Sequence, residues 1–247
     1  MTTNDVRVLV VDDEPEILNS FVELFSTFRF QVQPAGSGNK AWELLQKEDF
    51  HLVLSDVRMH DGDGISLAKK VRARHPSKPS FLFLSGYSDL TSEELYHIGA
   101  EGFFAKPANS TAVKDAIQRC LLSTENRWNL PLANPSTSKI RRSGADVDSL
   151  AKDSQVIFGR GGFFISTSEA PLQIWTQVDF EIEIQGPRPL MLKGAGVVRW
   201  NQTYAKQNAP LGMGIEILNL GFNEAKSYQE MFGNLREYIP SPRLAKS

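Results

Sequence analysis

The first half of the chain alternates short apolar runs with amphipathic stretches, and this alternation limits the fold more than any other feature. The apolar runs are VRVLVV (6–11), FQVQPA (30–35), HLVLSD (51–56), FLFLSG (81–86) and GFFAKP (102–107). Helical patterns follow them at 15–28, 39–48, 64–74, 89–99 and 110–122. A valine-rich run such as the first is typical of a strand buried on both faces of a parallel sheet. The pattern therefore predicts an α/β doubly wound domain with a five-stranded parallel sheet.

Polar residues stand at the ends of these predicted strands. They are Asp12, Asp13, Asp56, Ser85 and Lys106. Because ligands of parallel sheets bind at the carboxyl ends of the strands, we expect these side chains to meet. Clustered carboxylates repel one another unless a cation joins them, and a small set of oxygen ligands favours Mg²⁺. An aspartate in such a place can act as a nucleophile that takes up a phosphoryl group, with a lysine and a hydroxyl contacting its oxygens.

A single aspartate after a strand would be read as a solvated loop carboxylate, but the whole set matches a known pattern. Residues 1–122 resemble a response-regulator receiver domain, a flavodoxin-like fold, through VLVVDDEP, LVLSDVRM, FLFLSG and AKP. The resemblance implies a histidine kinase as phosphodonor and Asp56 as the phosphoryl acceptor and a metal ligand. It further implies that Mg²⁺ is bound directly by Asp13, through water by Asp12, and by the backbone carbonyl of Arg58. Ser85 would be the switch hydroxyl, Phe103 the aromatic that swings with it, and Lys106 the lysine that contacts the phosphate.

Three local details qualify this resemblance. The family usually has proline four residues after the acceptor, where this chain has His60. The Lys106–Pro107 bond is expected to be cis, which suits a tight turn. The segment GSGNKA (36–41) fits a dinucleotide fingerprint, but it follows the second predicted strand instead of the first. We therefore interpret it as a turn and a helix start.

The sequence pattern of the second half of the chain differs from that of the first. Residues 123–136 are rich in proline, asparagine and small polar residues, which predicts a linker. FFIST, TQVDFEIEI, LMLKGAGVVRW and LGMGIEIL then read as strands, and an amphipathic helix spans about 222–237. Strands without intervening helices predict a small antiparallel β-barrel with a closing helix over 137–238, followed by a tail at 239–247.

Residues from about 137 to 233 resemble a PilZ domain, through GRGGFFIST, GAGVVRW and APLGMGIEIL. The family typically binds cyclic di-GMP through an Arg-x-x-x-Arg pair and an Asp/Asn-x-Ser-x-x-Gly motif. Here Ile157 and Gly159 stand where two polar residues of the second motif are expected. Arg141, Arg142 and Arg160 remain candidates for a nucleotide phosphate. The alternative is that Gly161 and Gly162 serve a turn or bulge and that the arginines are solvated.

Composition excludes several classes of function. Residues 1–122 carry a net charge of −4 and residues 123–247 a net +2, so neither half has the basic excess of a nucleic-acid-binding domain. Four scattered histidines and the single Cys120 form no zinc motif and no disulfide pair. No apolar stretch is long enough for a membrane span, and the acidic N-terminus does not resemble a signal peptide. We expect a cytoplasmic protein that does not bind DNA.

These features predict a two-component response regulator that is phosphorylated on Asp56 and signals through a PilZ-like output by protein–protein contact. The expected partners are a histidine kinase, an effector protein and a second copy bound through the receiver. Enzymatic activity is expected only in its own phosphoryl transfer and aspartyl-phosphate hydrolysis. One alternative is a cyclic di-GMP receptor with a noncanonical arginine site, and a second is a phosphate sink.

Overall fold

The computed structural model divides into two compact units, which are described separately. It describes residues 5–86, 91–108, 110–122, 124–129, 136, 138–152, 155–187, 189–203, 210–242 and 244. The first unit comprises Met1–Thr91 and Ile98–Leu121, and the second comprises Ser92–His97 and Leu122–Ser247. Among the described residues, no helix is both long and apolar enough to cross a membrane.

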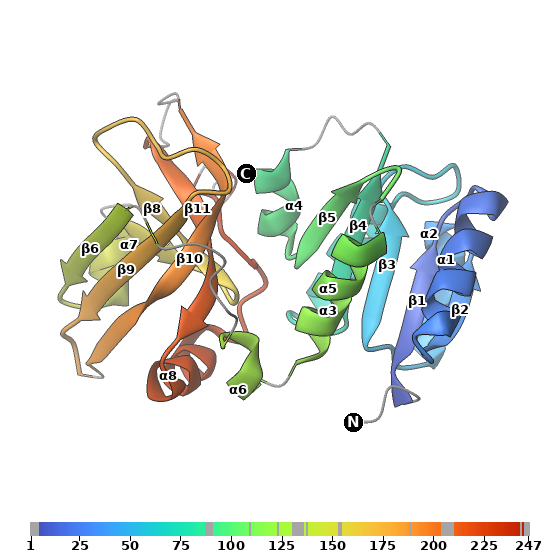
Figure 1. Ribbon diagram of the computed structural model, residues 1–247, viewed down its shortest axis with the longest axis horizontal. Helices are drawn as coiled ribbons and strands as arrows, with labels where there is room; N and C mark the ends of the chain where they lie inside the picture. The colour runs from blue at the N-terminus through green and yellow to red at the C-terminus, as the bar shows by residue number, and fades with distance from the viewer. Residues whose placement is uncertain are drawn as a thin grey trace. The chain divides into compact units, whose positions relative to one another are not determined.

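The first unit is built on a five-stranded sheet with every pair parallel (Figure 1). Its strands are β1 (Arg7–Val11), β2 (Gln31–Ala35), β3 (Leu52–Asp56), β4 (Ser80–Ser85) and β5 (Gly102–Ala105). They lie in the order β2-β1-β3-β4-β5, which is the flavodoxin-like order. Strands β3 and β4 are buried along their whole length, as continuous apolar runs require. The predicted parallel sheet is confirmed.

Helices of the first unit begin at residues that suit helix starts. They are α1 (Pro15–Thr27), α2 (Gly38–Lys47), α3 (Gly64–Arg74) and α5 (Ser110–Leu121). Helix α1 starts with Pro15, whose missing N–H costs nothing there, and its Phe25 is fully buried. The Ser37 side chain caps α2 by accepting from the Lys40 N–H, and Asp63 caps α3 at Ser66. The GSGN segment is therefore a helix start, as predicted, and not a nucleotide loop.

The second unit contains a six-stranded mixed sheet in the order β6-β9-β10-β11-β8-β7. The strands are β6 (Ser138–Gly144), β7 (Val156–Phe158), β8 (Gly162–Ser166), β9 (Gln177–Ile184), β10 (Leu190–Gln202) and β11 (Gly212–Leu220). Strand β6 pairs with β9 in parallel, so the prediction of a purely antiparallel barrel is wrong at this edge. The sequence SKIRRSG gave little sign of β6, because its side chains alternate between exposed and only half-buried.

Three short helices complete the second unit: α6 (Thr124–Arg127), α7 (Val147–Lys152) and α8 (Phe222–Phe232). Trp128, directly after α6, is 1% exposed and packs edge-on against Tyr228 of α8 with ring centroids 5.2 Å apart. The predicted linker therefore contributes to the core of this unit. At the other end Ile239 and Ser241 are fully buried, so packing continues beyond the predicted boundary at 238.

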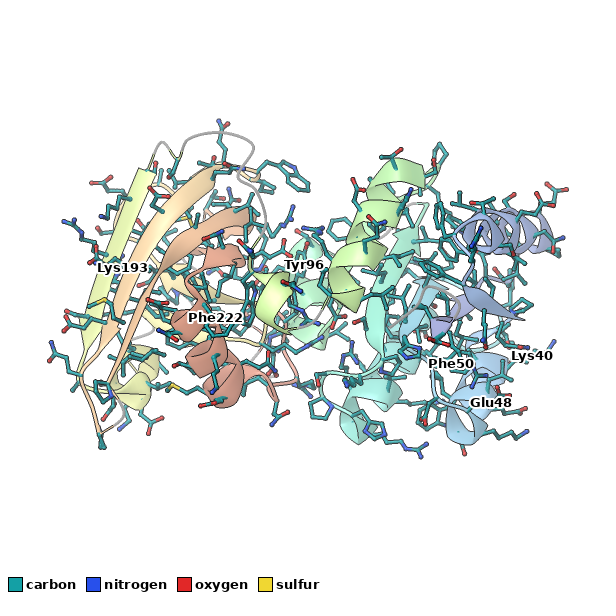
Figure 2. The ribbon with its side chains drawn as sticks, turned by 60° about the horizontal axis from the view of Figure 1, so that its bottom comes forward. Lys40, Glu48, Phe50, Tyr96, Lys193 and Phe222 are labelled. Atoms are coloured by element: carbon teal, nitrogen blue, oxygen red, sulfur yellow. The ribbon has the colours of Figure 1, made fainter. Side chains whose placement is uncertain are left out.

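The first six residues of helix α4 (Ser92–Ile98) belong to the second unit. The Tyr96 ring, labelled in Figure 2, stacks with the Tyr238 ring at 6.1 Å, and the Tyr238 N–H donates to the Tyr96 carbonyl. The Ser241 N–H donates to His97 Nδ1 at 3.1 Å, while the Ser241 hydroxyl donates to Glu93. The sequence assigned this segment to the first domain, because its helical pattern carries no information about which residues it packs against.

We expect the stability of the second unit to fall on mild acidification because of His97. Burial lowers the pKa of His97, and its Nδ1 must stay unprotonated to accept from Ser241. A histidine with a depressed pKa stabilises the fold fully above its unfolded pKa of about 6.5, and this stability is lost as the pH falls from that value through the lowered pKa of the folded state. Urea unfolding at pH 7.5 and 5.5 measures the difference. The variant His97→Gln should be less sensitive to pH, and an unchanged pH dependence would contradict the expectation.

Candidate functional site

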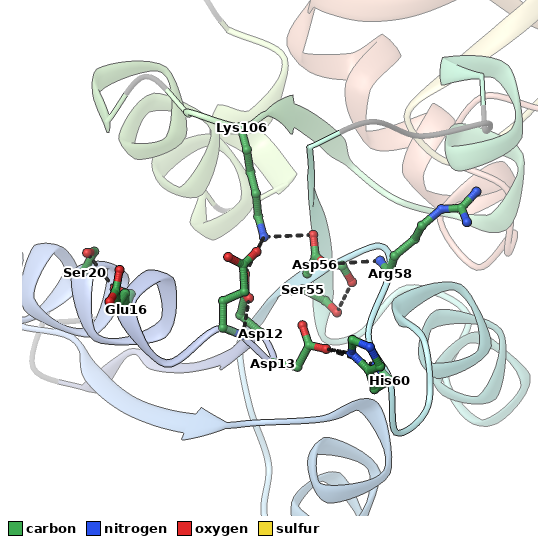
Figure 3. A network of polar contacts seen from close by, with 10 residues as sticks. Asp12, Asp13, Glu16, Ser20, Ser55, Asp56, Arg58, His60 and Lys106 are labelled. Atoms are coloured by element: carbon green, nitrogen blue, oxygen red, sulfur yellow. Dashed lines mark hydrogen bonds and ion pairs between the residues drawn. The ribbon is translucent and has the colours of Figure 1, made fainter.

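Three carboxylates meet at the carboxyl edge of the parallel sheet in the first unit (Figure 3). Asp12 and Asp13 follow β1, and Asp56 is the last residue of β3. Because β1 and β3 are neighbours in the sheet, their ends lie together, and one ligand oxygen of each carboxylate lies within 4.8 Å of the others. Asp12 and Asp56 are buried, and Asp13 is partly exposed. The sequence prediction that these residues come together is correct.

Lys106 joins two of these carboxylates. Its Nζ lies 2.8 Å from Asp12 Oδ2 and 3.1 Å from Asp56 Oδ1, with Glu14 Oε1 farther away at 3.7 Å. The peptide bond between Lys106 and Pro107 is cis, as the sequence predicted. The ammonium group offsets the repulsion that the buried carboxylates would otherwise exert on each other. The contact of Glu14 with Lys106 was not predicted.

The ionisation of the site reflects burial and this lysine. Burial raises the pKa of Asp56, while the hydrogen bond and charge of Lys106 partly oppose the increase. Burial also disfavours the charge on Lys106, but hydrogen bonds and charges from Asp12 and Asp56 outweigh it and raise the pKa of Lys106. The ammonium and the carboxylates therefore support each other's charged forms. Asp56 is a carboxylate held in a largely dehydrated place with a cation beside it.

Asp13 has a different partner. His60 donates its backbone N–H to Asp13 Oδ2 at 3.0 Å, and His60 Nδ1 lies 2.7 Å from the same oxygen (Figure 3). The hydrogen bond from the His60 side chain lowers the pKa of Asp13, against a smaller opposing effect of burial. The two residues stand 47 positions apart in the sequence. Because the loop after β3 brings these two residues together, no sequence pattern predicts the contact between Asp13 and His60.

The remaining predicted residues surround this edge. The Arg58 N–H donates to Asp56 Oδ2 at 3.2 Å, which sets the Arg58 backbone beside the acceptor. Ser85 ends β4 and is buried, and its carbonyl accepts from the Lys106 N–H at 2.7 Å. Phe103 in β5 is 38% exposed. These positions are consistent with the predicted roles.

The donor set fits Mg²⁺. Oxygen ligands from carboxylates, with room for water, are what this small hard cation prefers. Asp12, Asp13 and Asp56 supply such oxygens. A dication among them would neutralise the repulsion between all three carboxylates, whereas the Lys106 ion pairs involve Asp12 and Asp56. When bound, the ion would provide positive charge next to the Asp56 carboxylate.

The variant Gly64→Ala is expected to destabilise the first unit by about 1–3 kcal/mol, as overpacking does. A Cβ on Gly64 would lie 2.0 Å from the Asp56 carbonyl oxygen and 2.8 Å from Ser55 Oγ, so the backbone beneath the acceptor must move. Gly36→Ala is the matched control, since a Cβ there meets nothing within 4 Å. Urea unfolding of the two variants measures the effect. Equal midpoints for both variants would contradict the expectation.

The glycines of GRGGFFIS in the second unit leave no room for side chains. A Cβ on Gly161 would lie 2.0 Å from the Tyr238 ring, and one on Gly162 would lie 2.0 Å from the Ile215 carbonyl oxygen. A Cβ on Gly159 would lie 2.6 Å from the Tyr238 carbonyl oxygen. The backbone is therefore packed directly against its neighbours. This geometry supports the alternative in which these glycines serve a turn or bulge of the fold.

The three candidate arginines do not share one site. Arg160 is 1% exposed; its guanidinium donates to the Arg236 carbonyl and lies 5.3 Å over the Tyr238 ring. Arg141 and Arg142 belong to β6 and line a pocket of about 460 Å³ that Arg160 does not reach. The other lining residues are Ser143, Gln155, Glu181, Glu183 and Met191.

Basic side chains around this pocket already form ion pairs with an acidic residue. The Glu181 carboxylate lies 3.3 Å from Arg141 Nε, 3.3 Å from Lys139 Nζ and 3.1 Å from Lys193 Nζ (Lys193 is labelled in Figure 2). Arg142 donates to the Arg141 and Ser166 carbonyls. A second carboxylate, Glu183, lines the same pocket. A polyanionic ligand would have to displace these pairings and approach two carboxylates.

Comparison with known proteins agrees with the geometry of the first unit. Residues 8–118 match the family model described as the response regulator receiver domain. The chain is 32% identical over 127 residues to the transcriptional regulatory protein ZraR of Escherichia coli, and 30% identical over 116 residues to the response regulator protein PilR of Pseudomonas aeruginosa. These alignments cover 51% and 47% of this chain but only 29% and 26% of the relatives, so the chain spans under a third of the length of these relatives.

Solved structures match slightly less than half of the chain. The chemotaxis response regulator CheY4 of Vibrio cholerae is 29% identical, with a TM-score of 0.43, and the match covers 47% of this chain and 98% of that one. A receiver domain protein from Methanospirillum hungatei is 26% identical, with a TM-score of 0.44, and the match covers 46% of this chain and 90% of that one. The family model and the sequence relatives support a response regulator receiver domain in the N-terminal part of the chain.

Proposed function

We propose that this protein, whose N-terminal part is a response regulator receiver domain, is a phosphorylation-dependent regulator that takes a phosphoryl group onto Asp56 and acts on other proteins through its second unit. The observation that carries the proposal is the position of Asp56. Its carboxylate is dehydrated, lies 3.1 Å from Lys106 Nζ and adjoins two further carboxylates suited to a divalent cation. The phosphodonor in this proposal is a histidine kinase.

The chemistry follows from these contacts. One Asp56 carboxylate oxygen forms a bond to phosphorus as the phosphorus–nitrogen bond of a phosphohistidine breaks, and the histidine leaves. Lys106 lies where its ammonium can contact an oxygen of the transferred group. Asp12, Asp13, Asp56 and the Arg58 carbonyl would hold Mg²⁺, which supplies positive charge for the transferring phosphoryl group. Beyond this transfer and the later hydrolysis of the aspartyl phosphate, no catalytic activity is part of the proposal.

We propose that phosphorylation of Asp56 changes the conformation of Ser85 and Phe103. The Ser85 hydroxyl would turn towards the new phosphoryl oxygens, and Phe103 would move inward with it. Helix α4 follows β4 along the chain, and its first six residues belong to the second unit. A shift of α4 would change the stacking of Tyr96 on Tyr238 and with it the surface that a partner meets. A second copy of the chain and an effector protein are the proposed partners.

The test uses the full chain with acetyl phosphate and Mg²⁺. We expect a phosphoryl group that is labile to hydroxylamine and alkali, as an acyl phosphate is, and that peptide mapping after borohydride trapping assigns to Asp56. Hydrogen exchange should then change in peptides that cover α4 and residues 236–242. Modification at another residue, or none, would contradict the proposed chemistry. Modification of Asp56 without any change in exchange, partner binding or oligomeric state would favour a phosphate sink.

The second unit is proposed to be a PilZ-type output that works without cyclic di-GMP. The resemblance of GRGGFFIST, GAGVVRW and APLGMGIEIL supports the type of domain. The burial of Arg160 and the carboxylates beside Arg141 and Arg142 support the lack of nucleotide binding. Calorimetric titration of the full chain with cyclic di-GMP should give no binding heat. Low-micromolar binding that Arg141→Ala abolishes would establish the alternative, a receptor for both signals.

A further inference from the structure

The turn that precedes β9 exposes two large apolar side chains of the second unit. Trp175 is 69% exposed, and Ile174 beside it is 43% exposed. The φ angle of Trp175 is 74°, a left-handed conformation that a bulky residue rarely adopts. Its N–H donates to the Val198 carbonyl at 2.8 Å, and Arg199 Cζ lies 4.6 Å from the centroid of the Trp175 ring. Strained backbone that its surroundings hold in place is found at functional sites, and a fixed, exposed tryptophan is suited to anchor an interface.

The pocket beside β6 offers walls that suit an indole ring. Its lining residues include Arg141, Arg142, Glu183 and Met191. An indole can stack on a guanidinium, contact a methionine sulfur and donate its N–H to a carboxylate. Both Arg141 and Met191 are exposed, so a ring can reach them. A neutral ring that stacks on Arg141 leaves the ion pair with Glu181 in place, whereas a polyanion would have to displace that carboxylate.

The turn and the pocket lie at opposite ends of β9. Trp175 stands two residues before β9 begins, whereas Glu181 and Glu183 of the pocket lie in its second half. Met191 of the pocket pairs with Glu183 across the antiparallel β9–β10 ladder. At about 3.3 Å per residue, the six to eight residues between them separate the turn and the pocket by roughly 20–26 Å. No indole side chain spans this distance, so Trp175 can enter such a pocket only on another molecule.

We propose that Trp175 of one copy of the chain occupies the pocket of a second copy, so that the second unit carries a self-association surface. Because the turn and the pocket are far apart, a twofold axis can form both contacts at once and close the assembly as a dimer. Two contacts, each with a tryptophan, an isoleucine and the pocket walls, bury about 1,000 Å² in total, at the low end of specific interfaces. The dimer is therefore weak, with a dissociation constant in the micromolar range or above. The inference goes beyond the proposed function, since it requires neither phosphorylation nor the first unit.

The experiment measures self-association of the unphosphorylated full chain by sedimentation equilibrium over a series of concentrations. Trp175→Gly removes the ring and suits the positive φ angle, so the turn should persist while association weakens at least about tenfold, as loss of an anchor does. Met191→Glu adds a carboxylate to the pocket wall and should weaken association as strongly. Phe222→Ala is the matched control, since Phe222 is a similarly exposed aromatic of the same unit. Thermal midpoints confirm that each variant is folded.

A mixture of the two variants separates a complementary contact from two unrelated defects. Trp175→Gly keeps the pocket and Met191→Glu keeps the tryptophan, so an equimolar mixture can form one intact contact that neither variant forms alone. We expect the mixture to associate more tightly than either variant. A mixture that shows no gain, association that Trp175→Gly leaves unchanged, or an unmodified chain that stays monomeric at every concentration would overturn the inference. None of these outcomes bears on phosphoryl transfer to Asp56, which the labelling experiment tests.

Discussion

Asp56→Asn is expected to abolish phosphoryl uptake by the full chain. The amide has nearly the same shape as the carboxylate but lacks the nucleophilic charge, and loss of a covalent nucleophile costs on the order of 10⁴–10⁶ in rate. The amide also cannot form the ion pair that Asp56 makes with Lys106 at 3.1 Å. Incubation with acetyl phosphate and Mg²⁺, removal of the free reagent and quantification of protein-bound, hydroxylamine-labile phosphate measure the effect.

The matched control is Asp49→Asn, which changes an exposed aspartate just ahead of β3 and should be labelled as the unmodified chain is. Residual labelling of Asp56→Asn at a comparable rate would show that another group accepts phosphate. In that case Asp12 and Asp13 would be the next residues to change. Equal loss in both variants would instead point to damage to the fold.

The same substitution has a consequence for stability with a definite sign. Burial raises the pKa of Asp56, so the folded state binds this proton more tightly than the unfolded chain does. Stability from this group is therefore present at low pH and is lost as the pH rises from about 3.9 through the raised value. Without metal, Asp56→Asn should be more stable than the unmodified protein at neutral pH, and the difference should shrink on acidification. A constant difference across this range would contradict the assignment.

The parallel sheet could be predicted because its information is local. Each buried strand carries its own apolar run, and each functional side chain of the site follows such a run directly. Asp12, Asp56 and Lys106 therefore come together in any sheet with this strand order. The Asp13–His60 contact could not be predicted in this way, since it depends on the path of a loop.

The second unit was harder to predict because its packing joins segments far apart in the chain. Strand β6 has a weak alternating pattern and pairs with β9 in parallel, which no local signal specifies. Trp128 lies in a segment whose prolines and asparagines indicate a linker, yet a single large apolar side chain is enough to bring it into the core. The burial of Ile239 and Ser241 shows the same effect at the other end.

Arg72→Met is expected to destabilise the first unit by about 3–5 kcal/mol, because removing one partner of a buried ion pair leaves the other charge uncompensated. The Arg72 side chain is 0% exposed and that of Glu101 is 5% exposed. Arg72 Nη2 lies 3.1 Å from Glu101 Oε2, while Nε and Nη1 donate to the carbonyls of Gly99 and Pro79 at 2.9 and 2.8 Å. The guanidinium therefore joins helix α3 to the segments that precede β4 and β5.

Glu101 also accepts from the Phe81 N–H at 2.6 Å, so it is held inside the sheet when Arg72 is lost. Its carboxylate must then either stay charged without its partner or bind a proton, and both cost stability. Arg74→Met is the matched control, since Arg74 is exposed on the same helix and its replacement should cost little. Urea unfolding gives the free energies, and hydrogen exchange of peptides from β4 and β5 assigns the loss to the first unit.

The double variant Arg72→Met/Glu101→Leu distinguishes an uncompensated charge from a packing defect. Replacement of both members of a buried pair by apolar residues is often neutral or stabilising, because neither desolvation cost remains. We therefore expect the double variant to recover much of the stability that Arg72→Met loses, although Gly99, Pro79 and Phe81 each lose a hydrogen-bond partner. Additive losses in the double variant would mean that these backbone hydrogen bonds, and not the charge of Glu101, hold the amino ends of β4 and β5 in place.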